Sequence, residues 1–321
     1  FFSVGIGIFI AYICLQKAIL VIGNKSTLVS ITNFTKDFHT AGICSLLAVI
    51  GLLITVILYI KKVPGSILIG ILATWVIGML CQITGIYVPD FKTGYYSLFP
   101  TFAMTDFSKL GETFGKCFQY DLGKVGIFNF IAVVLSFLFV DLFDTLGTLV
   151  GVSTKAGMLD EEGKLPGIKP ALMADAVATT AGAVLGTSTV TTFVESSSGV
   201  AAGGRTGLTA VVSGFLFLIS TLFAPLFTAI PSFATAPALI MVGFLMFGAI
   251  SDIKFTDDNM TEAVPAYLCI IAMPLFYSIS EGISIGIISY VILNVVCGKA
   301  KKITPLMYVL AVLFILKYAV L

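Results

Sequence analysis

The sequence predicts an all-α protein that crosses a membrane many times, and three observations predict it. Hydrophobic residues make up 58% of the 321 residues, and charged residues make up only 11%. The mean hydropathy is +1.07, far above that of soluble globular domains. Apolar runs that are long enough to cross a hydrocarbon core as helices recur along the whole chain. Charge is balanced, with 18 basic and 17 acidic residues, so no nucleic-acid partner is indicated.

Apolar length defines eight expected membrane spans and a tail. The spans are expected at residues 3–22, 41–60, 65–88, 125–150, 207–230, 234–251, 264–278 and 282–297. The tail, residues 304–321, is long enough either to lie in the membrane or to cross it. Between 169 and 206 the pattern changes, because a short apolar helix, ALMADAVATTAGAVLG, precedes a stretch that is too polar and too rich in glycine for an ordinary span.

The short basic loops predict the orientation of these spans, because Lys and Arg concentrate on the cytoplasmic side. Lys61 and Lys62 mark one cytoplasmic loop. If residues 169–206 cross the membrane twice, the same face carries the other basic loops, namely 151–168, Arg205 and the lysines at 299, 301 and 302. The segment 89–124 then lies outside. Four of its residues share a helical face and predict an interfacial helix, with a structured loop as the alternative: Phe107, Leu110, Phe114 and Phe118.

Neither a metal site nor a disulfide framework is expected. The six cysteines are scattered, and most lie in apolar runs where a thiol serves as a small hydrophobic group. His39, the single histidine, is expected in a solvated loop. No cofactor is therefore predicted. Glycine pairs at helical spacing, Gly182 with Gly186 and Gly282 with Gly286, predict close approach of helices, and Glu281 is expected in a solvated turn between spans.

The stretch FVDLFDTLGTLVG, residues 139–151, places two carboxylates inside an apolar segment of helical length. Asp141 and Asp144 are three residues apart, and Thr145 and Thr148 continue the same side of the helix. A carboxylate near the bilayer centre costs a few kcal/mol or more, so this polar stripe is expected to face a cavity, a partner or a proton. The alternative is that the aspartates brace neighbouring helix ends inside the bundle.

A second polar constellation lies in LGTSTVTTFVESSSGVAAGGRTG, residues 185–207. The run 187–193 is rich in β-branched residues and favours an extended segment, while 196–204 consists of small residues that favour a short helix with Glu195 at its start. Extended backbone at membrane depth is tolerated where it lines a wet cavity, and broken helices of this kind mark transporter binding sites. A soluble loop is the alternative. Asp175, in the preceding helix, is expected to form hydrogen bonds with the broken backbone rather than to contact substrate.

These two segments, FVDLFDTLGTLVGV and TSTVTTFVESSSGVAAGGRTGLTAV, resemble those of the AzgA-like purine permeases, a branch of the nucleobase/cation symporter (xanthine/uracil permease) family with the uracil-permease fold. The resemblance covers essentially the whole chain. It implies a fragment of a fourteen-segment transporter with a 7+7 inverted repeat and a broken strand/half-helix segment, in which Phe1 matches the start of the fifth segment and the first four are missing.

The resemblance also implies a division into domains. Residues 1–122, with the external loop, resemble segments five to seven of the gate domain, and 233–297 resemble gate segments twelve to fourteen. Residues 123–232 resemble segments eight to eleven, the second half of the core domain, and 298–321 form the apolar tail. Core and gate would move against each other, as in an elevator, to expose the site alternately.

The resemblance also implies site residues, because motifs of the family match positions of this sequence. Asp144, followed by Gly147, matches the substrate carboxylate of the eighth segment, Asp141 matches a second acid one turn earlier, and Glu195 matches the acid of the tenth segment. Uracil permeases carry a histidine where this chain has Thr148, so their proton path cannot be copied; Thr148 and Asp175 are assigned to proton coupling or structure. A purine base presents N–H donors and acceptors on a flat edge, which carboxylates and the amide near Val194 can bind, and Phe137 and Phe193 are candidates to cover its faces.

The expected function is import of purine nucleobases, such as adenine, guanine or hypoxanthine, by proton symport across the cell membrane. The partners are the base, the proton and the lipid bilayer, and a homodimer is left open. Two alternatives remain. One is an anion transporter of the same fold, which the three acids and the lack of a basic residue argue against. The other is an intramembrane transferase that holds magnesium on Asp141 and Asp144, although the nearest basic residue, Lys155, lies beyond the span.

Overall fold

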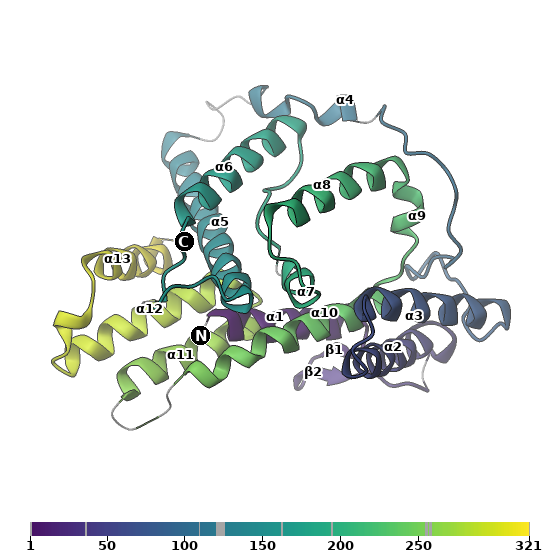
Figure 1. The fold of residues 1–321 in the computed structure, drawn as a ribbon, viewed down its shortest axis with the longest axis horizontal. Helices are drawn as coiled ribbons and strands as arrows, with labels where there is room; N and C mark the ends of the chain where they lie inside the picture. The colour runs from purple at the N-terminus through teal and green to yellow at the C-terminus, as the bar shows by residue number, and fades with distance from the viewer. Residues whose placement is uncertain are drawn as a thin grey trace. The chain divides into compact units, whose positions relative to one another are not determined.

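The structure is a computed structural model that describes residues 2–35, 37–108, 110–119, 126–161, 163–193, 195–253, 256 and 259–320. The described chain is mostly helical (Figure 1). It divides into two compact units. Unit 1 comprises Phe1–Phe9, Ser108–Ser196 and Leu245–Leu321, and unit 2 comprises Ile10–Phe107 and Ser197–Phe244.

Unit 2 begins with the second half of helix α1 (Phe2–Lys17) and a small antiparallel hairpin, β1 (Val21–Asn24) and β2 (Leu28–Ile31), in which Val21 pairs with Ile31. A π-helical turn, η1, then leads into α2. The helices of this unit are η1 (Phe38–Gly42), α2 (Ile43–Ile60), α3 (Ser66–Ile83), α7 (Ser196–Ala201), α8 (Gly207–Leu222), α9 (Ala224–Thr228) and α10 (Ser232–Phe247).

Unit 1 contains the start of α1, the long helix α5 and the C-terminal helices. Its elements are α4 (Leu110–Thr113), η2 (Lys116–Phe118), α5 (Ile127–Ala156), α6 (Ile168–Leu185), η4 (Gly248–Asp252), α11 (Met260–Leu275), α12 (Ile279–Val296), η6 (Ala300–Lys302) and α13 (Pro305–Val320). Helices α5 and α6 lie side by side in Figure 1.

Several helices are long and apolar enough to cross a membrane. Among the described residues they are Phe38–Ile60, Ser66–Ile83, Ile168–Leu185 and Ile279–Val296. Shorter apolar helices occupy other expected spans, at Ser3–Lys17, Gly207–Leu222, Ser232–Phe247 and Met260–Leu275. Together with α5 they form a multi-pass helical membrane protein, as the apolar pattern predicted.

Glycine and threonine alternate across the contact between α2 and α3. Thr55 and Thr74 are fully buried, and each donates its hydroxyl to the carbonyl of the glycine one turn earlier, Gly51 and Gly70 respectively. A Cβ added at Gly51 would lie 2.3 Å from Thr74 Oγ1, and one at Gly70 would lie 2.1 Å from Thr55 Oγ1. Each glycine therefore receives the threonine of the other helix. This contact needs no apolar side chain, which suits a membrane, where lipid competes equally for such side chains.

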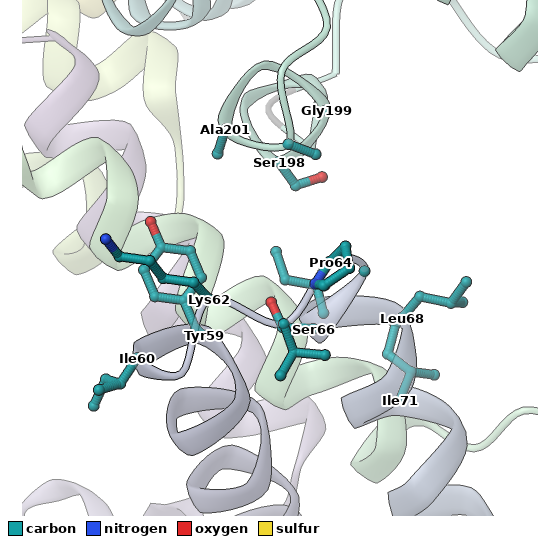
Figure 2. A pocket seen from close by; sticks show the side chains of 14 residues that line it. Tyr59, Ile60, Lys62, Pro64, Ser66, Leu68, Ile71, Ser198, Gly199 and Ala201 are labelled. Atoms are coloured by element: carbon teal, nitrogen blue, oxygen red, sulfur yellow. The ribbon is translucent and has the colours of Figure 1, made fainter.

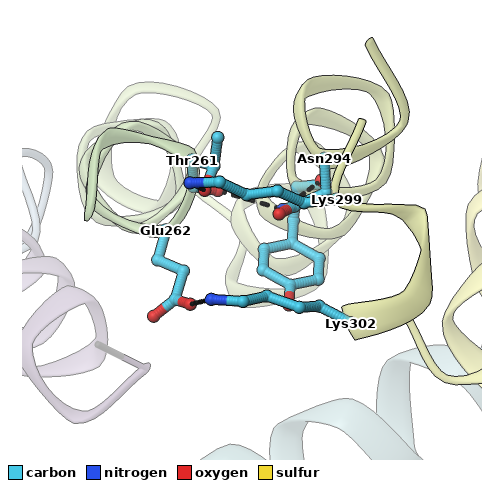
Figure 3. Close-up of polar contacts among 6 residues, drawn as sticks. Thr261, Glu262, Asn294, Lys299 and Lys302 are labelled. Atoms are coloured by element: carbon cyan, nitrogen blue, oxygen red, sulfur yellow. Dashed lines mark hydrogen bonds and ion pairs between the residues drawn. The ribbon is translucent and has the colours of Figure 1, made fainter. Parts of the chain in front are cut away.

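A second close contact joins α11 to α12. A Cβ at Gly282 would lie 2.3 Å from Met273 Cγ, and one at Gly286 would lie 2.8 Å from Cys269 Cβ. The helix approach predicted from the Gly282–Gly286 spacing is thus confirmed. At the far end of the pair, Asn294 is fully buried and donates to the carbonyls of Thr261 and Tyr290, at 3.2 and 2.9 Å (Figure 3). Lys299 donates to the Thr261 hydroxyl at 3.3 Å, and Lys302 pairs with Glu262 at 3.5 Å.

Glu281 does not lie in a solvated turn, as expected from sequence. It occupies the first turn of α12, where its backbone N–H donates to the hydroxyl of Ser278, the N-cap. Its half-buried carboxylate accepts hydrogen bonds from Lys317 and Tyr318 of α13. The expectation was wrong because the partners lie far away in sequence, on the apolar tail. The tail is a helix that this ion pair ties to α12.

The segment between α3 and α5 is tied to the middle of α3 and to the C-terminal ends of α6 and α8. The indole N–H of Trp75, on α3, donates to the Leu98 carbonyl at 2.9 Å. The amide of Thr105 donates to the carbonyl of Leu222, the last residue of α8, at 3.0 Å, and the amide of Gly115 donates to Val184 of α6 at 2.8 Å. Carbonyls at helix ends lack partners within the helix, so the segment caps both α6 and α8. The outer location of this segment stays a prediction.

The interfacial helix expected around Phe107–Phe118 is broken in the structure. The described residues form only one short turn of α-helix, α4, and one of 3-10 helix, η2. Between them Gly115 adopts a left-handed conformation with φ of +68°. Its amide is directed to Val184, so capping α6 overrides the local helical pattern.

The reciprocal glycine–threonine contact leads to a prediction for Gly70→Ala. The new methyl group would overlap Thr55, so the free energy of unfolding should fall by about 1–3 kcal/mol, the usual cost of overpacking. Thermal unfolding of the detergent-solubilised protein measures this, and adding Thr55→Ala to Gly70→Ala should restore part of the loss. Gly214→Ala on α8 is the control, because nothing lies within 4 Å of its added Cβ. Equal melting temperatures for Gly70→Ala and Gly214→Ala would contradict the packing described here.

Candidate functional site

The polar stripe predicted from FVDLFDTLGTLVG lies in the middle of α5 and faces the interior of unit 1. Thr145 is fully buried and Thr148 is 3% exposed, while Asp141 and Asp144 are half-buried. The hydroxyl of Thr148 donates to the carbonyls of Asp144 and Thr145, at 2.9 and 3.1 Å. Thr148 is therefore occupied within its own helix. The acids and Thr145 are the groups of this stripe that can act on a neighbour.

A hydrogen bond between α5 and α6 joins the stripe to Asp175. The Thr145 hydroxyl donates to Asp175 Oδ2 at 3.2 Å. Asp144 lies within electrostatic range of both Asp141 and Asp175, so the structure brings these three of the four predicted acids together. One carboxylate oxygen of Asp141, Oδ1, is buried and has no hydrogen-bond partner among the described residues.

The charge of this cluster is not balanced by a basic residue of the same two helices. The lysines of α5 and α6, Lys155 and Lys169, lie near helix ends. Carboxylates at membrane depth need a counterpart, because each is expensive to place there. A cluster of acids without a cation favours the binding of a proton or of a ligand that offers N–H donors.

Glycines on α5 bring the stripe close to other helices of unit 1. A Cβ at Gly147 would lie 2.8 Å from Ile6 Cδ1, and one at Gly151 would lie 2.8 Å from Met246 Cε and 3.1 Å from Ser3 Oγ. The glycine three residues after Asp144 thus has a packing role. It lets α1 approach the helix that carries the acids.

Residues 187–193 follow α6 and form neither a helix nor a paired strand among the described residues. Thr179, one turn after Asp175 on α6, holds this segment. Its hydroxyl donates to the Val190 carbonyl at 3.0 Å and accepts from the Val190 amide at 3.2 Å. The contact expected of Asp175 is thus made by Thr179, which the sequence reasoning missed. Its only signal was its position one helical turn from Asp175.

Gly182 lets residues 187–190 fold back onto α6. A Cβ there would lie 2.8 Å from Thr187 Oγ1 and 3.3 Å from the Ser188 carbonyl oxygen. Gly186 ends the helix in a left-handed conformation, with φ of +82°. The predicted Gly182–Gly186 pair therefore serves a turn and a fold-back of the chain.

Glu195 lies directly before α7, the short helix predicted at this place, and its side chain is exposed. Phe137 and Phe193 are 68% and 64% exposed among the described residues, so both are accessible to a ligand. Val194 lies outside the described residues. The joint action of Asp144 and Glu195 on one ligand stays a prediction.

Comparison with known proteins decides the family. The Xan_ur_permease model, described as "Permease family", matches residues 1–285. The chain belongs to the xanthine/uracil permease family. The permease is 44% identical to the guanine/hypoxanthine permease PbuG of Bacillus subtilis over 314 residues, which are 98% of this chain and 66% of the relative. It is 43% identical over 323 residues to the guanine/hypoxanthine permease PbuO of the same organism, covering 99% and 69% of the two chains.

A further relative carries a different substrate in its name. The permease is 38% identical to the adenine permease AdeP of Escherichia coli over 313 residues, which are 98% of this chain and 65% of the relative. The chain therefore spans about two thirds of the length of these relatives. The family consists of transporters, so the intramembrane transferase with magnesium on Asp141 and Asp144 is withdrawn.

The contact between Thr179 and Val190 leads to a prediction for the permease. Thr179→Val keeps the shape of the side chain but removes both hydrogen bonds to Val190, so residues 187–193 should open more often. At about 0.5–1.5 kcal/mol for a hydrogen bond, amide exchange at Val190 should become roughly three to ten times faster. Hydrogen exchange followed by mass spectrometry measures this on the peptide that contains Val190. Thr179→Ser, which keeps the hydroxyl, should exchange as the parent does; a similar acceleration in both variants would argue against the contact.

Proposed function

We propose that this permease imports purine nucleobases, such as adenine, guanine or hypoxanthine, by proton symport across the cell membrane. The observation that carries the proposal is the acidic cluster of Asp141, Asp144 and Asp175 on two apolar helices, with Asp175 hydrogen-bonded to Thr145. The lysines described on these two helices lie near helix ends, away from the cluster. The names of the relatives, two guanine/hypoxanthine permeases and one adenine permease, support a purine as the ligand.

Recognition of the base would use its flat edge. Asp144 and Glu195 would accept hydrogen bonds from ring and exocyclic N–H groups, and the amide near Val194 would donate to an acceptor. Phe137 and Phe193, whose rings are exposed, would cover the faces of the base. Asp141 would support Asp144 or take up a proton. The hydrogen-bonding roles follow from the donors and acceptors that a purine base carries.

Proton coupling would run through the acids rather than through a histidine. The Thr145 hydroxyl holds Asp175 on α6 close to the acids of α5. A proton on Asp141 or Asp144 would therefore reduce the negative charge near Asp175. Thr148 is assigned a structural role, because its hydroxyl bonds within its own helix. The base, through its N–H donors, and the proton would thus bind at the same acidic cluster. Both would reduce the repulsion between its carboxylates.

The proposed architecture is that of the uracil-permease fold, with a 7+7 inverted repeat and residues 187–201 as a broken span. Residues 1–122 and 233–297 would belong to the gate, 123–232 to the core and 298–321 to the tail. Core movement against the gate would expose the site alternately. A homodimer remains an open alternative to a single functional chain.

Anion transport with the same fold is the second candidate function. It would need basic groups or amide donors at the site, and the acidic cluster opposes an anion at this place by simple repulsion. The acidic cluster therefore favours a base.

Substitution of the two acids tests the proposal in the protein that carries this chain at its full natural length. Asp144→Asn and Glu195→Gln each remove the charge that holds an N–H donor, so uptake of radiolabelled guanine, hypoxanthine or adenine should fall by roughly ten-fold or more. Uptake is measured in cells that lack endogenous permeases, with unlabelled bases as competitors. A proton uncoupler should abolish accumulation by the parent.

Glu161→Gln, in the exposed loop between α5 and α6, is the matched control and should transport as the parent does. Normal uptake by both Asp144→Asn and Glu195→Gln would reject the site. Accumulation that survives the uncoupler would reject proton symport while leaving the substrate in place. Uptake of sulfate or bicarbonate in place of bases would select the anion transporter.

A further inference from the structure

The turn between α2 and α3 holds a lysine in a conformation that usually belongs to glycine. The amide of Lys62 donates to the Tyr59 carbonyl at 2.9 Å, and the amide of Val63 donates to the Leu58 carbonyl at 3.1 Å. These two bonds form a Schellman motif, in which the residue at the position of Lys62 is commonly glycine. Lys62 has φ of +55°, which strains a residue with a side chain. A strained residue that is not glycine suggests that its side chain has a use.

Lys62 lines a cavity inside unit 2. The cavity has a volume of about 790 Å³, within the range of small-molecule sites. Figure 2 shows α7 on one side, with Ser198, Gly199 and Ala201, and the turn on the other. Apolar side chains of α3, among them Leu68 and Ile71, form one wall, and the small residues of α7 form the opposite one. An apolar wall opposite small residues suits the faces of a flat ring.

The cavity occupies a definite place along the chain's path through the membrane. Helix α7 begins directly after Glu195, one of the acids assigned to the base. Lys61 and Lys62 belong to the basic loop that marks the cytoplasmic face. Helix α7 therefore connects this cavity to Glu195 along the chain, and the predicted orientation puts the cavity at the cytoplasmic face.

We propose that the cavity between α7 and the α2–α3 turn is the cytoplasmic vestibule of the permease, where a purine base stops before release, and that Lys62 is its polar contact. The ammonium group of Lys62 offers three donors, and ring nitrogens and carbonyl oxygens of a purine are acceptors. The vestibule therefore complements the acidic cluster, which binds the N–H groups of the base. This inference rests on the proposed function, since it takes the same base as ligand.

Cysteine accessibility tests the vestibule in the full-length protein, after its six native cysteines in this chain, and any outside it, have been replaced. Ser198→Cys and Leu68→Cys line the cavity, whereas Ile69→Cys, on the neighbouring residue of α3, is exposed but does not. A membrane-impermeant thiol reagent should modify the first two at least about ten times faster in inside-out than in right-side-out vesicles. Ile69→Cys should stay slow from both sides, and hypoxanthine or adenine should protect Ser198→Cys.

Substitution of Lys62 separates a ligand contact from a structural role. Lys62→Gly removes the ammonium and relieves the strain, so the protein should melt at the same or a higher temperature. Half-protection of Ser198→Cys should nevertheless require roughly ten times more base, because one hydrogen bond from a charged group is lost. Lys62→Arg should keep protection close to that of the parent. Lys61→Gly, at a lysine that does not line the cavity, should leave it unchanged.

The outcomes divide clearly. Faster modification with base protection, weakened by Lys62→Gly alone, supports the vestibule. If the cysteine-free protein still takes up bases but Ser198→Cys reacts no faster than Ile69→Cys, or is not protected, the vestibule is overturned and the proposed function stands. Equal loss of protection in Lys62→Gly and Lys61→Gly overturns the role of Lys62. If no base is taken up or protects any position, the proposed function itself is overturned.

Discussion

The rest of this structure depends on how a few carboxylates are kept inside an apolar protein. Asp141, Asp144 and Asp175 lie on two helices that are otherwise built to meet lipid or other helices. The hydroxyl of Thr145 on α5 links the two helices by its hydrogen bond to Asp175 on α6. Such groups are stable at membrane depth only where protein, water, a proton or a ligand satisfies them. The need to satisfy them dictates which helix faces turn inward and where the chain must open.

Close packing around these acids depends on glycine rather than on large apolar side chains. Gly147 and Gly151 bring α5 against α1 and Met246, and Gly182 lets the irregular segment return onto α6. In water, burying large side chains would drive such contacts, but within a bilayer the lipid offers the same apolar surroundings. Close approach of the helix backbones at glycine, and hydrogen bonds from threonine hydroxyl groups, stabilise these contacts instead. This explains why threonine recurs beside glycine at the α2–α3 crossing as well.

Sequence was sufficient for features that depend on local period and composition. The apolar runs predicted the helices, and the Gly282–Gly286 spacing predicted the close approach of α12 to α11. Features that depend on distant partners were missed. Gly115 breaks the predicted interfacial helix because it caps α6, and Glu281 is paired because Lys317 returns to it.

The same reasoning explains how much of the candidate site was accessible from sequence. Acids in an apolar run stand out because of their cost, so Asp141 and Asp144 could be found without a structure. Thr179 could not, because a threonine in a helix is ordinary and becomes informative only when Val190 lies opposite it. An uncharged polar residue that supports a site can be identified only once its hydrogen-bond partner is known from the structure. A charged residue in an apolar segment can be identified from the sequence alone.

The buried oxygen of Asp141 connects structure and transport. Oδ1 of this residue has no hydrogen-bond partner among the described residues, in a cluster that also contains the carboxyl groups of Asp144 and Asp175. An unsatisfied buried acceptor costs about 1–3 kcal/mol, and more when it is charged. Protonation removes the charge, and an N–H donor of a base supplies the missing bond. In the proposed mechanism, either event would make the other acids easier to keep inside the protein, so the cluster would be costly when empty and more stable with proton and base bound. Because a transporter must move with its cargo rather than without it, the cost of the empty cluster would then itself couple proton and base.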